Sequence, residues 1–168
     1  MTQLWLVRHG ESQGNVDGSQ GDTPLSARGR EQAARLAETL RGEVFDQVVS
    51  SPLIRARETA SLALPEANLV IEEAIRELVV PPETFIDIHG LGPEELRALL
   101  DSARREHQGV ETGLEFIARI KAWVAALPGD ARVIAFTHFG VVRECLRLLG
   151  EGPAPQFIEH CEVHLVQV

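Results

Sequence analysis

The chain has 168 residues, 44% of them hydrophobic and 24% charged, a balance typical of a folded globular protein long enough to bury its own core. Asp and Glu outnumber Lys and Arg by 25 to 16, and the formal net charge of -9 argues against binding to nucleic acid or to an anionic membrane surface. Two cysteines, an amino terminus without a signal-peptide pattern and the lack of any apolar run of membrane-spanning length predict a soluble protein of the reducing cytoplasm.

In the first half of the chain, short apolar runs alternate with helical patterns. Strands are predicted by the apolar runs at 4–7, 48–49 and 69–71. A loop rich in Gly, Ser, Asp and Asn at 10–23 precedes a helix that starts after Ser26 and ends near Gly42. Ser51 and Pro52 predict the N-cap and the first turn of a second helix.

The second half repeats this alternation after an irregular stretch at 78–92. A helix is expected to open at Pro93, with one apolar face formed by Leu96, Leu99, Leu100 and Ala103. The capping box at 112–115 predicts the start of another helix, and a further helix is expected to end at Gly150. Strands are predicted at 132–136 and 162–168.

Strands that alternate with helices predict an α/β protein, here a three-layer α/β/α sandwich with a mostly parallel central sheet. We expect one domain over 1–168, because no linker or repeat interrupts the chain. In such sheets the chemistry lies at the carboxyl ends of the strands. The residues that follow Val7, Val49 and Phe136 are therefore the candidates for a functional site.

Arginines and histidines follow these three strands. Arg8 and His9 follow the first, Arg55 comes shortly after the second, and His138 follows the third. A phosphoryl group has three peripheral oxygens, which arginines and a protonated imidazole can neutralise. A neutral imidazole can also attack phosphorus and form a covalent intermediate. These residues alone indicate phosphoryl chemistry.

The sequence lacks the common metal-binding and nucleotide-binding motifs. It contains no H-E-x-x-H motif, no cysteine-rich ligand set and no G-x-x-x-x-G-K-[ST] loop. The other histidines lack metal-ligand spacing and are expected to be structural or exposed: His89, His107, His160 and His164. We therefore expect neither a metal nor another cofactor.

Several segments, in this order, resemble the histidine phosphatase superfamily, which includes cofactor-dependent phosphoglycerate mutases and many phosphatases. The matching segments are 6–12 with Asn15, 23–26 with Gly29, 50–53 with Arg55, Glu77, 109–112 and 137–143. The resemblance extends over about 4–149 and implies a phosphoglycerate mutase-like fold.

The resemblance implies a role for each matching residue. His9 would attack phosphorus and become phosphohistidine. Glu77 would protonate the leaving alkoxide and then activate the water that hydrolyses the intermediate. The phosphate pocket would be lined by Arg8, Asn15, Arg55 and His138.

Each of these residues also has a structural interpretation, since a histidine beside a strand end is often a capped structural residue. Arg55 could belong to a solvated helix face, Asn15 could favour a loop turn, and Glu77 lies among other acidic residues that could be surface charges. The stretch after Glu77 also lacks the aromatic-glycine and Glu-Gly segments common in the family, which leaves the leaving-group site open and makes Glu83 the alternative acid.

The leading hypothesis is a metal-independent phosphomonoesterase that acts on a small phosphorylated metabolite. A short chain with a compact 78–92 segment favours water over a second phosphoryl acceptor. The alternatives are phosphoryl transfer of the phosphoglycerate mutase type and a non-catalytic phosphate-binding regulatory module, while a metallohydrolase fits poorly. Neither nucleic acid nor a membrane is expected as a partner, and the chain could be a monomer or a homodimer.

Overall fold

The computed structural model describes residues 1–19, 21–79, 94–95, 98, 101, 111–150 and 155–168. The chain divides into two compact units, Met1–Glu77 with Ile120–Val168, and Leu78–Arg119. The first unit contains the sheet and every site residue discussed below. The single domain expected over 1–168 stays a prediction.

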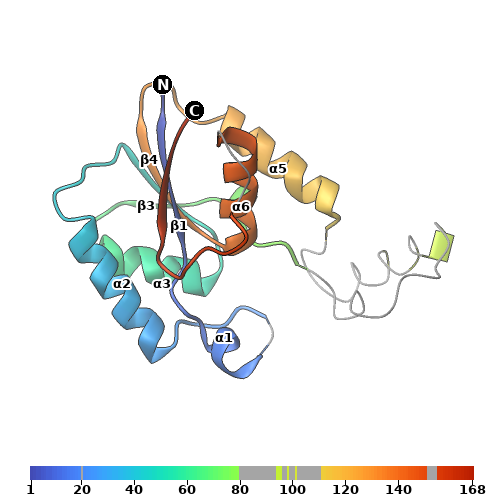
Figure 1. The fold of residues 1–168 in the computed structure, drawn as a ribbon, viewed down its shortest axis with the longest axis horizontal. Helices are drawn as coiled ribbons and strands as arrows, with labels where there is room; N and C mark the ends of the chain where they lie inside the picture. The colour runs from blue at the N-terminus through green and yellow to red at the C-terminus, as the bar shows by residue number, and fades with distance from the viewer. Residues whose placement is uncertain (20, 80–93, 96–97, 99–100, 102–110, 151–154) are drawn as a thin grey trace. The chain divides into compact units, whose positions relative to one another are not determined.

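Five strands form one sheet in the order β3-β2-β4-β1-β5 (Figure 1). Their bounds are β1 Gln3–Arg8, β2 Gln47–Ser50, β3 Leu69–Ile71, β4 Arg132–Thr137 and β5 Val163–Gln167. The first four strands in this order are parallel, whereas β5 is antiparallel to β1. The mostly parallel sheet is thus confirmed, and β5 begins at the edge where β1 and β4 end.

The helices begin at polar caps that the sequence supplies. Their bounds are α1 Gln13–Asp17, α2 Ala27–Thr39, α3 Ile54–Ala63, α5 Gly113–Ala125 and α6 Phe139–Leu149, with a 3-10 turn at Glu73–Ile75. The Ser26 side chain accepts the Gly29 N–H at the start of α2, as predicted. Helix α1 corrects the loop predicted at 10–23. It is too short to show an apolar periodicity and is held by reciprocal side-chain bonds between Ser12 and Asn15.

The start of α3 differs from the prediction. The helix begins at Ile54 with Leu53 at the N-cap, not at Ser51 and Pro52. Ser51 instead extends the pairing of β2 with β4, since its N–H donates to the Phe136 carbonyl at 2.9 Å. Its hydroxyl still accepts the Leu53 N–H at 3.3 Å, but a second contact to His138 draws it toward the site.

Helices cover both faces of the sheet, as expected for three layers (Figure 1). On one face, α2 and α3 pack on the sheet through a cluster of buried side chains: Val7, Leu36, Leu40, Val48, Ala60, Ala63, Ile134 and Phe136. Because side chains alternate along a strand, Val133 and Ala135 of β4 point to the opposite face. On that face α6 contacts β1 and β5 and buries Val141, Val142 and Cys145.

Parts of the sequence-based prediction fall on residues that are not described. The apolar face of the helix expected from Pro93 lies outside the described residues, as do Glu83, His89 and His107. The capping box at 112–115 is confirmed, because the Thr112 hydroxyl accepts the Glu115 N–H at 3.2 Å. Within the described ranges, no helix is long and apolar enough to cross a membrane.

Candidate active site

The predicted site residues meet at the edge where the parallel strands end. Arg8 is the last residue of β1, and His9 follows it. His138 follows β4 and is the N-cap of α6, while Arg55 lies in the first turn of α3, just after β2. Parallel pairing of β1, β2 and β4 brings these segments together although they are far apart in the sequence.

His9 is a buried imidazole with a defined tautomer. Its side chain is only 5% exposed, and its Nδ1 lies 2.6 Å from the Gly10 carbonyl oxygen, which can only accept, so Nδ1 carries the proton. Its Nε2 lies 3.3 Å from the Nε of Arg55, which can only donate, so Nε2 presents its lone pair. Burial and the positive charge of Arg55 lower the pKa of His9 to about 3. The ring is therefore neutral near pH 7, as a nucleophile must be.

Glycines allow the backbone around His9 to pack tightly. A Cβ on Gly10 would lie 2.6 Å from the Gly29 carbonyl oxygen, so no larger residue fits there without moving the start of α2. The Gly10 N–H donates to the Thr59 hydroxyl of α3 at 3.0 Å. These contacts hold Gly10, the residue whose carbonyl sets the tautomer of His9.

His138 lies beside His9 and is fully buried. The two ring centroids are 5.1 Å apart with an interplanar angle of 62°. The Nε2 of His138 forms a hydrogen bond of 2.7 Å with the Ser51 hydroxyl. Ser51 therefore orients His138, a role that its interpretation as a helix cap missed.

The two arginines are held by different partners. Besides His9, Arg55 has Asp22 as a neighbour, with 3.8 Å between Nη1 and the carboxylate Oδ1. Arg8 donates from Nη1 to the Ile158 carbonyl, and its Nη2 lies 3.0 Å from Nε2 of His160. Both arginines are partly buried, and the positive charges of both lower the pKa of His9.

Burial lowers the pKa of both Arg8 and Arg55, and nearby carboxylates oppose this shift. Glu77 acts on both arginines, and Asp22 acts on Arg55. Glu77 therefore lies close enough to both arginines to oppose the effect of burial on their pKa values. Its role as the catalytic acid stays a prediction.

The backbone near Glu77 is anchored to the end of β4. The Thr137 hydroxyl donates to the carbonyl of the fully buried Ile75 at 2.6 Å. The Glu77 carboxylate accepts the Gly140 N–H, in the first turn of α6, at 3.0 Å. The structure thus brings Glu77 to the same edge as His138.

Asn15 is close to the site, but its side-chain oxygen has a structural role. This Oδ1 accepts from both the backbone and the hydroxyl of Ser12, at 2.9 and 2.8 Å. Any donation from Asn15 to a phosphate must come from Nδ2. The turn-forming and ligand-binding interpretations of Asn15 are therefore compatible.

His160 is a neighbour of the site that the sequence analysis assigned to the structural or exposed histidines. Its ring centroid lies 5.9 Å from that of His9. It precedes β5, and because β5 is antiparallel to β1, the start of β5 lies at the edge where the parallel strands end. The rule that examines only the residues after parallel strands misses such a residue. Among the described residues, no group of three or more His, Cys, Asp or Glu could hold a metal ion.

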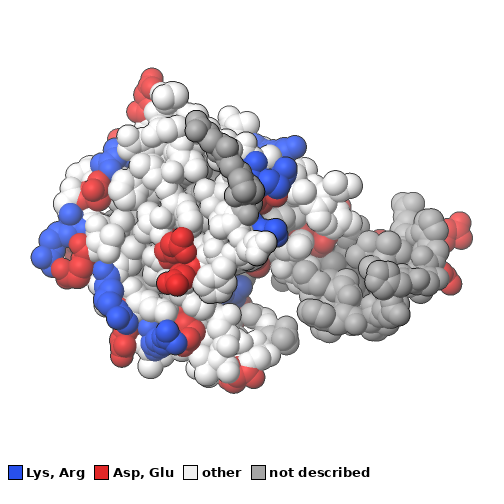
Figure 2. Space-filling model, viewed as in Figure 1, with Lys and Arg blue, Asp and Glu red and all other residues white. Residues whose placement is uncertain are grey.

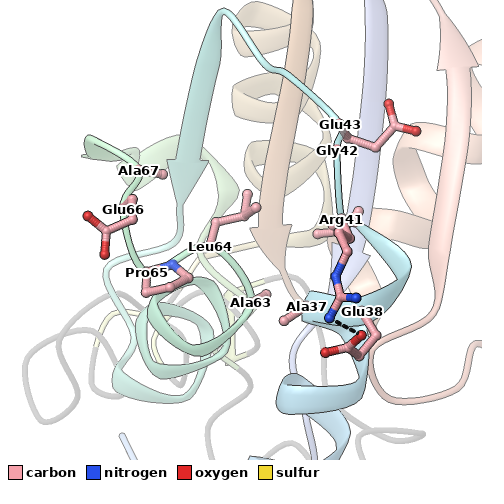
Figure 3. Close-up of a pocket in the computed structure, with 11 residues that line it drawn as sticks. Ala37, Glu38, Arg41, Gly42, Glu43, Ala63, Leu64, Pro65, Glu66 and Ala67 are labelled. Carbon is pink, nitrogen blue, oxygen red and sulfur yellow. Dashed lines mark ion pairs between the residues drawn. The ribbon is translucent and has the colours of Figure 1, made fainter.

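A second hollow lies at the opposite edge of the sheet, between the carboxyl ends of α2 and α3 (Figure 3). It has a cavity volume of about 370 Å³. Its apolar lining includes Leu40 and Leu64. Its charged lining includes several glutamates and Arg41, and Arg41 is paired to Glu38. With its arginine already paired, this groove is a poor site for a phosphate.

Comparisons with known proteins agree with this geometry. The family model described as "Histidine phosphatase superfamily (branch 1)" matches residues 4–168. An adenosylcobalamin/alpha-ribazole phosphatase of Escherichia coli K12 is 48% identical over 73 residues, which cover 42% of this chain and 36% of that protein.

Two solved structures are similar over most of their length. The phosphoglycerate mutase of Thermus thermophilus has 33% sequence identity and a TM-score of 0.70, covering 98% of this chain and 92% of that one. The alpha-ribazole phosphatase of Shigella flexneri has 31% identity and a TM-score of 0.66, covering 89% of this chain and 81% of that one. The fold is thus phosphoglycerate mutase-like, and the chain is an enzyme of the histidine phosphatase superfamily.

Proposed function

We propose that this enzyme hydrolyses small phosphate monoesters through a phosphohistidine on His9, without a metal ion. The observation that carries the proposal is the hydrogen-bond geometry around the His9 ring. Its proton is fixed on Nδ1 by the Gly10 carbonyl, and its Nε2 lone pair faces the Arg55 guanidinium. A phosphate bound between the arginines would meet this lone pair.

In the first step, Nε2 of His9 attacks phosphorus as the bond from phosphorus to the ester oxygen breaks. The Nδ1 proton stays on the ring, and the Gly10 carbonyl stabilises the positive charge that forms on the imidazole. Glu77, protonated at this point, gives its proton to the leaving alkoxide. Arg8 and Arg55 neutralise the peripheral oxygens of the phosphoryl group.

In the second step, the Glu77 carboxylate takes a proton from water as the water oxygen attacks phosphorus. The bond between phosphorus and Nε2 breaks, inorganic phosphate forms, and the neutral imidazole is restored. Glu77 ends protonated, ready for the next turnover. The same group therefore serves as acid and then as base.

The substrate we propose is a small phosphorylated metabolite. Two of the similar proteins are named alpha-ribazole phosphatases, so α-ribazole 5′-phosphate is the first ester to assay. The net charge of -9 repels an anionic substrate at long range, so affinity rests on the local arginines. On the face drawn in Figure 2, acidic and basic side chains are interspersed, and this fits a small ligand better than nucleic acid. Two free cysteines fit the proposed reducing cytoplasm.

A second candidate function is phosphoryl transfer of the mutase type. It is favoured by the similarity to the Thermus thermophilus phosphoglycerate mutase. A mutase returns the phosphoryl group to a second hydroxyl and needs a bisphosphate to prime His9. A requirement for a bisphosphate would therefore separate the two functions.

The test is hydrolysis of p-nitrophenyl phosphate in the presence of EDTA, with His9→Ala assayed beside the wild type. We expect chelator-resistant turnover that falls by at least about a thousandfold in the variant, because the covalent route is lost. His164→Ala is the matched control, since its ring pairs with Glu162 at 2.9 Å and lies in β5. Turnover that persists in His9→Ala, or that EDTA removes, would contradict the proposal.

A further inference from the structure

The segment that leads into β5 contacts both terminal nitrogens of the Arg8 guanidinium. The carbonyl of the fully buried Ile158 accepts from Nη1 of Arg8, and Nε2 of His160 lies 3.0 Å from Nη2. The segment also contacts the main chain of Arg8, because the Cys161 N–H donates to the Arg8 carbonyl at 2.9 Å. We call residues 158–162 the Arg8 clasp.

The clasp is a turn that backbone hydrogen bonds hold. Cys161 has a φ of 60°, a left-handed conformation that residues other than glycine rarely adopt. The Glu162 N–H donates to the Glu159 carbonyl at 3.2 Å, and the Glu162 carbonyl accepts the Arg8 N–H at 3.3 Å. A strained residue held between such bonds marks a position that its surroundings determine closely. His160 is therefore placed by the fold against Arg8.

The protonation of His160 follows from its partners. A guanidinium can only donate, so a hydrogen bond to Nη2 of Arg8 requires a lone pair on Nε2 of His160. Burial and the charge of Arg8 lower the pKa of His160 to about 4, which favours this neutral form. The Asn15 oxygen is 3.3 Å from the same Nε2, but it already accepts two bonds from Ser12. Arg8 is thus the partner of His160.

We propose that His160 is a positioning residue of the phosphate pocket, which holds the Arg8 guanidinium so that its remaining N–H groups face the phosphate. Arg8 has five N–H donors, and the clasp engages one on each terminal nitrogen. The Nε of Arg8 is buried without a hydrogen-bond partner among the described residues. This inference rests on the proposed function, since it concerns the same phosphate.

The experiment measures binding of inorganic phosphate by isothermal titration calorimetry, together with kcat and KM on p-nitrophenyl phosphate. His160→Leu removes the acceptor, whereas His160→Gln keeps an oxygen or nitrogen near the Nε2 position. We expect His160→Leu to weaken phosphate binding and raise KM by about tenfold with a smaller change in kcat, because a hydrogen bond to a charged group is lost. His160→Gln should return both values to within about threefold of the wild type, through its amide oxygen.

His164→Leu is the matched control, since it removes another histidine, which lies in β5 after the clasp. Melting temperatures of all variants separate unfolding from a local effect. Equal phosphate affinity in the wild type and His160→Leu, or a failure of His160→Gln to recover affinity while it stays folded, would overturn the inference and leave the proposed function standing. A wild type that neither binds phosphate nor hydrolyses p-nitrophenyl phosphate would overturn both.

Discussion

The two edges of the sheet, where the parallel strands end (the carboxyl edge) and where they begin (the opposite edge), differ in the burial of their polar side chains. At the carboxyl edge, polar side chains are buried: His9, Ser12, Ser26, Ser50, Ser51, Thr59, Thr137 and His138. At the opposite edge, Thr2 is buried with its hydroxyl bonded to the Pro128 carbonyl, but the charged side chains pair in solvent, as Arg41 does with Glu38 and the amino terminus with Asp130. Burial of a polar group costs free energy unless a hydrogen bond replaces water. Buried polar side chains at the carboxyl edge therefore need hydrogen-bond partners, and those partners fix their positions.

The hydrogen bonds at the carboxyl edge support this interpretation. Ser51 bonds His138, Thr59 bonds Gly10 beside the nucleophile, and Thr137 anchors the turn before Glu77. These three buried hydroxyls thus position residues of the proposed reaction. At the opposite edge, where the groove lies, the ion pairs are exposed, and such pairs contribute little to stability. Substitutions at the carboxyl edge should therefore have large effects, and substitutions at the opposite edge small ones.

The largest effect after His9 is expected for Glu77→Gln. Glutamine keeps an acceptor for the Gly140 N–H but supplies no proton and takes none from water. We expect turnover of an alkyl phosphate to fall by about a hundredfold to ten-thousandfold. On p-nitrophenyl phosphate, whose leaving group needs no proton, we expect a burst of about one product per enzyme followed by slow turnover, as phosphohistidine accumulates. Stopped-flow absorbance measures both phases.

The matched control is Glu73→Gln, an exposed acid in the turn before Glu77. It should leave both phases unchanged. If Glu77→Gln hydrolysed the alkyl phosphate at the wild-type rate, the acid would lie elsewhere, and Glu83 would be tested next.

A smaller effect is expected when the support of His138 is removed. Ser51→Ala deletes the partner of His138 Nε2, whereas Ser50→Ala deletes a hydroxyl bonded to the Ser51 carbonyl. Both serines are fully buried, so each variant should lose about 1–3 kcal/mol in the free energy of unfolding. Only Ser51→Ala should also lower kcat/KM, by about tenfold, through misplacement of His138. Equal kinetics in the two variants would argue against a positioning role for Ser51.

Acid should destabilise the protein through His9. Burial and Arg55 lower its folded pKa to about 3 from the ordinary 6.5, so between these pH values the unfolded chain binds a proton that the folded chain does not. The free energy of unfolding therefore falls as the pH decreases through this window, by roughly 2–3 kcal/mol at about pH 4.5. His9→Asn removes this contribution and should lose less stability between about pH 7 and 4.5. Urea denaturation of both proteins at the two pH values measures the difference, and parallel losses would refute the buried neutral imidazole.

Much of the fold followed from local patterns. The apolar runs at 4–7 and 132–136 became β1 and β4, and the Ser26 cap started α2 where expected. The exceptions were short elements and side chains with distant partners. Helix α1 shows no periodicity because it buries nothing, and Ser51 is drawn from its expected cap role by His138, 87 residues away.

The sequence predicted four site residues because they follow parallel strands: Arg8, His9, Arg55 and His138. Glu77 and Asn15 came from the family resemblance alone. His160 was not predicted as a site residue, because the sequence does not reveal that the last strand pairs antiparallel with β1 and brings its own start to the edge. That contact depends on strand order, which is a property of the whole sheet.

The smallest effect is expected at the groove between α2 and α3. Arg41→Ala breaks the exposed ion pair with Glu38, and it should change the free energy of unfolding by less than about 0.5 kcal/mol. Turnover should not change, because α2 and α3 begin at the carboxyl edge and end at the groove, a full helix length away. Thermal melts and p-nitrophenyl phosphate kinetics check both statements. A loss of activity without a loss of stability would mean that the groove acts on the site through these helices, and the division between a functional and a solvated edge would then fail.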